Sequence, residues 1–178
     1  MITVISGSNR KGTECLTFAT AYAKMLRELT DEPVKLLALD AIPHDWFHAD
    51  MYDNPSPSII ALQDEYILPA DKFAFFSSEY NGGFNGALKL FLDAVSVRRY
   101  SDNFKGKKAA LIGVASGRAG NLRGMDHLTG ILNHVGAIVM PNKLPISRIE
   151  KLLDDDGELI DPPTLQVLEA HARELVDF

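Results

Sequence analysis

The chain has 178 residues, 46% of them hydrophobic and 24% charged, with a formal net charge of -6. These values are typical of a globular protein with a sizeable core, and the acidic balance argues against nucleic acid or an anionic membrane as the main partner. The single cysteine, Cys15, and the lack of an apolar run of roughly 20 residues, the length that spans a bilayer, predict a cytoplasmic protein. We therefore expect one domain over residues 1–178.

Short apolar runs alternate with amphipathic helical patterns along the first half of the chain. Strands are expected at Ile2–Ser6, Pro33–Leu39 and Lys72–Ser77. Helices are expected at Thr13–Leu29 and Ser58–Leu68, with a proline- and aspartate-rich loop at Asp40–Pro57 between them.

The same alternation continues to the end of the chain. Helices are expected at Gly86–Val95, Leu122–His134 and Pro163–Leu175, and strands at Lys108–Ala115 and Gly136–Met140. Strands that alternate with helices of this length predict a parallel sheet covered on both faces. The pattern favours an α/β, flavodoxin-like three-layer sandwich with a five-stranded parallel sheet of order 2-1-3-4-5, and a Rossmann order stays open.

Ligands of such sheets bind beyond the carboxyl ends of the strands, and the loop Gly7–Thr13 follows the first strand. Its two glycines permit a tight turn, and successive backbone N–H groups can point at an anion. The hydroxyl of Ser8 and the guanidinium of Arg10 add donors suited to a phosphate. The spacing matches neither a Walker A loop nor a dinucleotide fingerprint. The alternative is that Thr13 is simply a helix N-cap.

Two further loops are rich in glycine and polar residues. Ser77–Gly86 follows the third strand and can present backbone amides to the edge of a flat heterocycle, on which Tyr80 can stack. A flexible connection capped by Asn85 is the alternative. Ala115–Asn121 follows the fourth strand and places Arg118 near a ligand.

Taken together, the loops resemble those of the NADPH-dependent FMN reductase family, which includes related quinone, azo-dye and chromate reductases. Gly7–Thr13 is similar to the family's GSxRxGS-type loop, and Ser78–Asn81 is similar to its PEYN-type segment. Gly86–Asp93 is similar to the helix that follows, and Ser116–Arg118 matches part of a Ser-Gly-Gly-Arg-like turn. Ser78 replaces the usual proline of the second motif.

The resemblance implies FMN as the cofactor, with NADPH or NADH as co-substrate. It assigns the FMN phosphate to Ser8, Asn9, Arg10 and Thr13. It assigns the isoalloxazine ring to Glu79, Tyr80, Asn81, Gly82, Ser116 and Gly117, with Arg118 close to the ligand. FMN itself carries the redox chemistry, so no side chain is assigned as a general acid or base.

The predicted function is an NAD(P)H-dependent flavin reductase that passes electrons to free flavin, a quinone or another small acceptor. A non-catalytic FMN-binding electron carrier or regulatory module is the alternative. The family resemblance and two aromatics expected to be exposed, Trp46 and Phe47, favour a homodimer or homotetramer. Trp46 can instead pack on its own domain.

Three other groups of residues have a structural interpretation that is favoured over a functional one. Cys15 is a small buried residue rather than a reactive thiol. The histidines and aspartates of 44–50 form a solvated loop rather than a metal site. Arg98 and Arg99 face water rather than a nicotinamide-cofactor phosphate or a second subunit.

Overall fold

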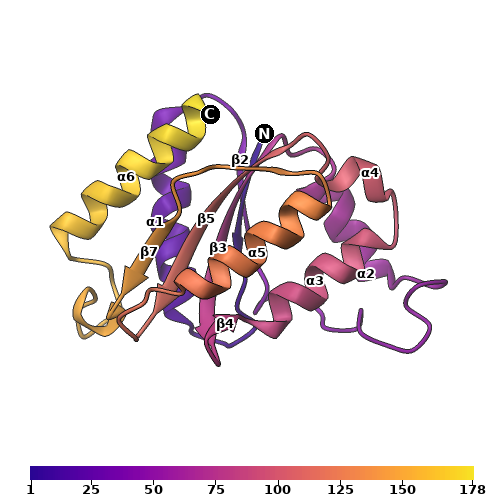
Figure 1. Cartoon of the computed structure of the whole chain (residues 1–178), viewed down its shortest axis with the longest axis horizontal. Coiled ribbons are helices and arrows are strands. Elements are labelled where there is room, and N and C mark those ends of the chain that lie inside the picture. Colours follow the sequence, from indigo (N-terminus) through magenta and orange to yellow (C-terminus); the bar gives the residue numbers. More distant parts are fainter.

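The sheet of the computed structural model, which describes residues 1–178, has the strand order β2-β1-β3-β5-β6 (Figure 1). All neighbouring strands along this path are parallel. The strands are β1 (Ile2–Ser6), β2 (Val34–Ala38), β3 (Lys72–Tyr80), β5 (Lys108–Ala115) and β6 (Ile138–Val139). The flavodoxin-like order predicted from the sequence is confirmed, and the Rossmann order is not observed.

The last position of the sheet is occupied by two short strands instead of the one expected at Gly136–Met140. β6 pairs with the start of β5, and β7 (Leu144–Ser147) pairs with its end from Ile112 to Ala115. Pro141 lies between them and has no N–H to donate to β5, so the pairing stops there and resumes three residues later.

Helices cover both faces of the sheet. One face carries α1 (Glu14–Leu29) and α6 (Pro162–Asp177). The other carries α2 (Pro57–Leu62), α3 (Gly86–Ser96), α4 (Tyr100–Asn103) and α5 (Leu122–His134). None of these helices is long and apolar enough to cross a membrane.

A hydrophobic core lies on each face of the sheet, and side chains of β3 alternate between the two cores. Phe73 and Phe75 belong to the cluster under α3 and α5, whereas Ala74 and Phe76 belong to the cluster under α1 and α6. Successive side chains of a strand point to opposite faces, so a strand buried on both sides is apolar throughout. α2 continues into a π-helical turn over Gln63–Ile67. These two segments together correspond to the helix expected at Ser58–Leu68.

Trp46 corrects an expectation drawn from the sequence. Only 6% of its surface is exposed, and its ring lies edge-on to Phe91 at 5.7 Å, so the packed alternative is the correct one. Phe47, the next residue, is 71% exposed as expected. The indole N–H also donates to the Pro43 carbonyl oxygen, which satisfies its polar group inside the core.

A buried hydrogen-bonded pair joins α1 to α6. The Nε2 atom of His171 lies 3.1 Å from the Asn142 carbonyl oxygen and must donate to it, so Nδ1 is the acceptor. The hydroxyl of Tyr22 donates to Nδ1 at 2.9 Å. Burial lowers the pKa of His171 because it disfavours the charged imidazolium, even though the Asn142 carbonyl and Glu174 act in the opposite direction.

We predict a loss of stability in mild acid that is due to His171. The unfolded chain takes up a proton as pH falls below about 6.5, while the folded chain takes it up only at lower pH. The free energy of unfolding should therefore fall with decreasing pH, by up to about 1.4 kcal/mol per pH unit in that window. Urea denaturation at several pH values should show a shallower pH slope for His171→Gln than for wild type. Equal slopes would rule out His171 as the source.

Candidate functional site

The loop between β1 and α1 is fixed to β3 and to the start of α3. The Gly7 N–H donates to the Phe76 carbonyl oxygen at 2.9 Å, and the Asn85 side chain donates to the Gly7 carbonyl oxygen. A Cβ atom at Gly7 would lie only 2.8 Å from the Phe76 oxygen, so the close approach requires glycine. The position of the loop is therefore set by the sheet.

This loop presents hydrogen-bond donors that have no acceptor within the chain. The backbone N–H groups of Asn9, Lys11, Gly12 and Thr13 make no intramolecular hydrogen bond. The Arg10 and Lys11 side chains are exposed and form no ion pair. Free amides at a helix N-terminus, beside two free cations, fit the chemistry of a phosphate group.

Ser8 and Thr13 shape this loop from inside. Ser8 is fully buried, and its Oγ accepts the Arg10 N–H at 3.2 Å. Thr13 is the N-cap of α1, because its Oγ1 accepts the Cys15 N–H at 3.3 Å. The capping role is thus real, and it leaves the Thr13 backbone N–H and hydroxyl proton free for a ligand.

The segment after the third predicted strand is a β-hairpin rather than the open loop expected from Ser77 to Gly86. β3 continues to Tyr80 and pairs with β4 (Gly83–Phe84) in antiparallel fashion. Asn81 and Gly82 form the two-residue turn with φ values of 53° and 75°, both in the left-handed region. These are the values of a type I′ turn, for which Asn-Gly is the preferred sequence. Tyr80 is 45% exposed at the end of the hairpin.

The β5–α5 loop is tied to this hairpin through Asn121, which the sequence analysis did not single out. The Asn121 side chain donates to the carbonyl oxygen of Ser77 at 2.9 Å and to its hydroxyl at 3.1 Å. The Asn121 backbone N–H donates to the Glu79 carboxylate at 3.0 Å. Glu79 therefore joins two of the predicted ligand loops. Asn121 has a φ of 64°, a conformation that asparagine tolerates better than most residues.

Glycines allow the same loop to approach the hairpin closely. A Cβ atom at Gly124 would lie 2.0 Å from the Asn121 Oδ1 atom and 2.5 Å from the Phe84 nitrogen. One at Gly113 would lie 2.1 Å from the Gly120 carbonyl oxygen. No side chain fits at either distance, so these glycines determine how the loop packs.

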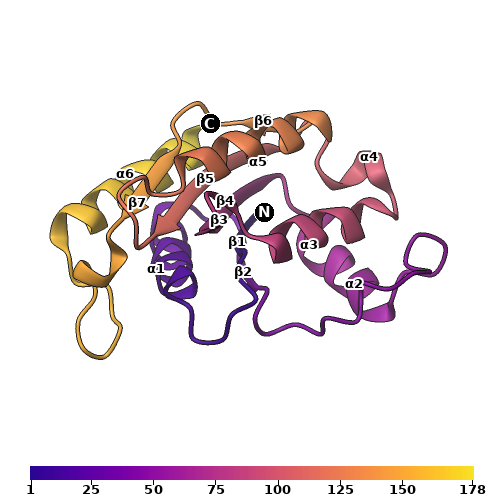
Figure 2. The same cartoon turned by 60° about the horizontal axis from the view of Figure 1, so that its bottom comes forward.

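The structure brings the predicted site residues to one edge of the sheet. β3 lies between β1 and β5, so the loops that follow these three strands are neighbours (Figure 2). Asn9, Arg10, Tyr80, Asn81, Gly82, Ser116, Gly117 and Arg118 are exposed there. Ser8 and Thr13 are buried in the first loop, and Glu79 is half-buried against Asn121.

Cys15, Arg98 and Arg99 are not available to a ligand at this edge of the sheet. The Cys15 thiol is fully buried, 3.5 Å from the Phe76 carbonyl oxygen, and burial raises its pKa, so it stays a protonated thiol at neutral pH. Arg98 pairs with Asp64 at 2.6 Å and Arg99 with Asp102 at 2.9 Å. Both follow the C-terminal end of α3, at the opposite edge of the sheet from the ligand loops.

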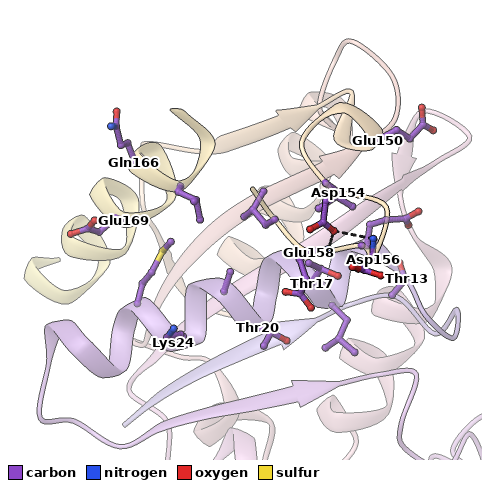
Figure 3. Close-up of a pocket in the computed structure, with 18 of the residues that line it drawn as sticks. Thr13, Thr17, Thr20, Lys24, Glu150, Asp154, Asp156, Glu158, Gln166 and Glu169 are labelled. Atoms are coloured by element: carbon purple, nitrogen blue, oxygen red, sulfur yellow. Dashed lines mark hydrogen bonds between the residues drawn. The ribbon is translucent and has the colours of Figure 1, made fainter. Parts of the chain in front are cut away.

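A groove of about 1130 Å³ runs along the outer side of α1, beginning at Gly12 and Thr13 (Figure 3). The other wall is formed by α6 and by the turn at 154–157, with Asp154 and Asp156 close to the Thr13 end. Two cations line it, Lys24 and Arg173, against eight carboxylates: Glu14, Glu28, Glu150, Asp154, Asp155, Asp156, Glu158 and Glu169. Such a surface disfavours an anionic ligand.

Comparison with known proteins identifies relatives of this chain. The model of the NADPH-dependent FMN reductase family matches residues 1–151. An NAD(P)H-dependent FMN reductase of Pseudomonas aeruginosa is 29% identical over 144 residues, covering 80% of this chain and 76% of the relative. An NADPH:quinone oxidoreductase of Arabidopsis thaliana is 29% identical over 174 residues, covering 94% of this chain and 85% of the relative.

Solved structures agree with this picture. The flavoenzyme NAD(P)H:(acceptor) oxidoreductase FerB of Paracoccus denitrificans superposes with a TM-score of 0.72 at 28% identity, covering 99% of this chain and 94% of that one. An NADH:FMN oxidoreductase superposes with a TM-score of 0.74 at 17% identity, covering 97% of this chain and 88% of that one, which supports the fold alone.

Proposed function

The chain belongs to the NADPH-dependent FMN reductase family, whose members use FMN with NAD(P)H as the electron donor, and we propose that it is an FMN-dependent reductase of free flavins or quinones. The observation that carries the proposal is the loop Gly7–Thr13, with its free amides and two unpaired cations at the carboxyl edge of the sheet. We assign this activity to one domain spanning residues 1–178, in the cytoplasm.

The FMN phosphate is assigned to the first loop. The amides of Asn9 and Thr13 and the guanidinium of Arg10 donate to it, while Ser8 holds the loop in shape through the Arg10 N–H. Arginine suits this role because its planar guanidinium can bind two phosphate oxygens at once.

The isoalloxazine ring is assigned to the β3–β4 hairpin and the β5–α5 loop. Tyr80, Asn81 and Gly82 supply the exposed side chain and backbone of the hairpin tip, and Ser116 and Gly117 supply the facing loop. Glu79 holds the two together through the Asn121 N–H. Bound FMN would supply the redox chemistry, which is hydride and electron transfer. The side chains bind and orient, and none is assigned a proton transfer.

Two finer features of the proposal have separate support. The Arabidopsis relative is a quinone oxidoreductase, which supports quinones as acceptors. The family resemblance and the 71% exposed side chain of Phe47 support a homodimer or homotetramer, since exposed aromatics are enriched at interfaces. Light scattering at micromolar concentration gives the mass directly, and a strictly monomeric mass would reject the assembly.

Steady-state kinetics tests the proposal against a non-catalytic electron carrier. With FMN present, the protein should consume NADPH continuously when quinone or free flavin is supplied. Initial rates should give parallel double-reciprocal lines, because one ligand edge leaves the nucleotide and the acceptor to occupy the same place in turn. Intersecting lines would contradict this single-site picture. A carrier would show no sustained NADPH consumption.

A further inference from the structure

Asn85 lies at the N-cap position of α3, directly after β4, but it does not cap the helix (Figure 1). Its side chain accepts no N–H group from the first turn of α3, and its Oδ1 atom is buried without a partner. Only 3% of the residue is exposed, and its Nδ2 group donates instead to the Gly7 carbonyl oxygen. An asparagine at this position ordinarily stabilises a helix by capping it. Here the side chain is committed to a contact outside the helix, with the phosphate loop (Gly7–Thr13).

Gly7 is the only residue through which hydrogen bonds join the phosphate loop to the sheet and the hairpin. Its N–H donates to the Phe76 carbonyl oxygen at 2.9 Å, and its carbonyl oxygen accepts the Asn85 amide. The other hydrogen bonds of the loop stay within it or lead into α1. The position of the loop relative to its neighbours therefore depends on two hydrogen bonds, one of which a side chain makes.

The sheet no longer joins the loop to the hairpin at the level where a ligand binds. The parallel pairing of β1 with β3 ends at Ser6 and Phe76. On its other side β3 stays paired with β5 as far as Ser78, and Asn121 adds further bonds there. The hairpin is thus fixed on the β5 side by several hydrogen bonds. On the β1 side, beyond Phe76, the hydrogen bond from Asn85 is the one that joins it to the loop.

This bond lies between the two parts of the proposed FMN site. The phosphate is assigned to the loop and the isoalloxazine ring to the hairpin tip and the β5–α5 loop, so one ligand spans both. A ligand held at one end gains most from the contact at its other end when the two sites keep a fixed separation, because the second contact then forms at a high effective concentration. A bond that fixes this separation increases the contribution of the phosphate to the affinity for FMN without contacting FMN.

We propose that Asn85 is a positioning residue that fixes the phosphate loop relative to the hairpin, and that it thereby sets how strongly the protein prefers FMN to riboflavin. The inference rests on the proposed function and deepens it, because it assigns part of the cofactor preference to a residue outside the predicted flavin contacts.

The first test compares FMN and riboflavin binding by wild type and Asn85→Ala, with fluorescence titration as the measurement. The variant loses the bond to Gly7, so its dissociation constant for FMN should rise roughly tenfold, the upper end of the range for one neutral hydrogen bond. Its constant for riboflavin should change little, since riboflavin has no phosphate to place on the loop. In a double variant with Arg10→Ala, the second replacement should add less than it does alone, because both act on the same phosphate contact.

Asn103→Ala is the matched control. Asn103 is also buried, and its Nδ2 group donates to the carbonyl oxygens of Val95 at 2.8 Å and Arg98 at 3.1 Å. It lies in α4, at the opposite edge of the sheet from the ligand loops. This variant should be less resistant to urea than wild type but should keep the wild-type ratio of FMN to riboflavin affinity. A loss of stability alone therefore does not reproduce the result expected for Asn85→Ala.

Asn85→Asp provides a rescue that a merely structural role would not show. The carboxyl group has nearly the size of the amide, and it can donate to the Gly7 carbonyl oxygen only while it is protonated. Burial raises the pKa of such a carboxyl group above its ordinary value of about 3.9. The affinity of this variant for FMN should therefore approach that of wild type at low pH and fall as the pH rises through this pKa. Wild type and Asn85→Ala at the same pH values account for the titration of the FMN phosphate and of His127, whose ring packs on Phe84.

The outcomes separate this inference from the proposed function. Equal losses of affinity for FMN and riboflavin in Asn85→Ala, or no loss for either, would overturn the role of Asn85 while leaving the reductase in place. An Asn85→Asp affinity as weak as that of Asn85→Ala at every pH would overturn it as well. Bound FMN that NADPH does not reduce would overturn the proposed function, and the binding comparison would still decide the inference.

Discussion

Replacing Gly124 with alanine is expected to lower the free energy of unfolding by about 1–3 kcal/mol, the scale of overpacking, and to weaken FMN binding. The added Cβ atom would lie 2.0 Å from Asn121 Oδ1 and 2.5 Å from the Phe84 nitrogen. Relief must move either Asn121, which holds the β5–α5 loop to Ser77 and Glu79, or the β3–β4 hairpin. Both carry residues assigned to the flavin ring.

The same helix supplies a matched control. Gly130 lies in α5 as well, and a Cβ atom there meets nothing within 4 Å. Gly130→Ala should therefore raise the stability by roughly 0.5–1 kcal/mol, the helix-propensity difference, and keep the wild-type affinity for FMN. Urea denaturation and fluorescence titration with FMN measure both effects. Indistinguishable behaviour of the two variants would refute the close packing of loop and hairpin.

Arg10→Ala is expected to raise the dissociation constant for FMN roughly 10- to 150-fold, the equivalent of about 1.5–3 kcal/mol for a hydrogen bond to a charged group. Arg10 is exposed in the loop of free amides and has no partner within the chain. Its removal should leave the fold intact, since its side chain supports no other residue.

Riboflavin provides the control for this prediction because it lacks the phosphate. Its affinity should be nearly the same for wild type and Arg10→Ala, so the preference for FMN over riboflavin should shrink in the variant. Fluorescence quenching of each flavin during titration gives the two constants. An unchanged dissociation constant for FMN in Arg10→Ala would contradict the assignment of the phosphate to this loop.

The succession of strands and helices could be predicted because it follows from local patterns, whereas the strand order was only favoured and a Rossmann order stayed open until the structure was known. The apolar runs of β1, β3 and β5 and the amphipathic helices between them are each recognisable alone, and parallel strands need such crossovers. The position of the ligand loops then follows, since they come after neighbouring strands. This is why the predicted site residues lie on one edge of the structure.

Features that depend on contacts between distant segments were harder to predict. Trp46 belongs to a polar loop, and only the packing against Phe91 shows that it is buried. The break between β6 and β7 depends on pairing with β5. Pro141 indicated where the first of these strands ends, but not that pairing resumes after it. The sequence Asn81-Gly82 is typical of a hairpin turn. The hairpin was not predicted because the apolar run of β3 ends at Ser77.

The role of Asn121 could not have been read from its own neighbourhood. Its partners, Ser77 and Glu79, are 44 and 42 residues away in the sequence. Glycine at 113 and 124 likewise appeared ordinary for an α/β loop and helix, and only the distances to Gly120 and Asn121 show that larger residues do not fit. Long-range contacts of this kind are fixed by the whole fold.

The most direct test of the account is an anaerobic titration of the purified protein with FMN, followed by NADPH in the absence of any acceptor. Binding should saturate at one FMN per chain, with a perturbed visible spectrum, and one equivalent of NADPH should then bleach the absorption of the bound flavin. An FMN spectrum unaffected by the protein, or bound FMN that NADPH does not reduce, would contradict the assignment of this chain as an FMN-dependent reductase.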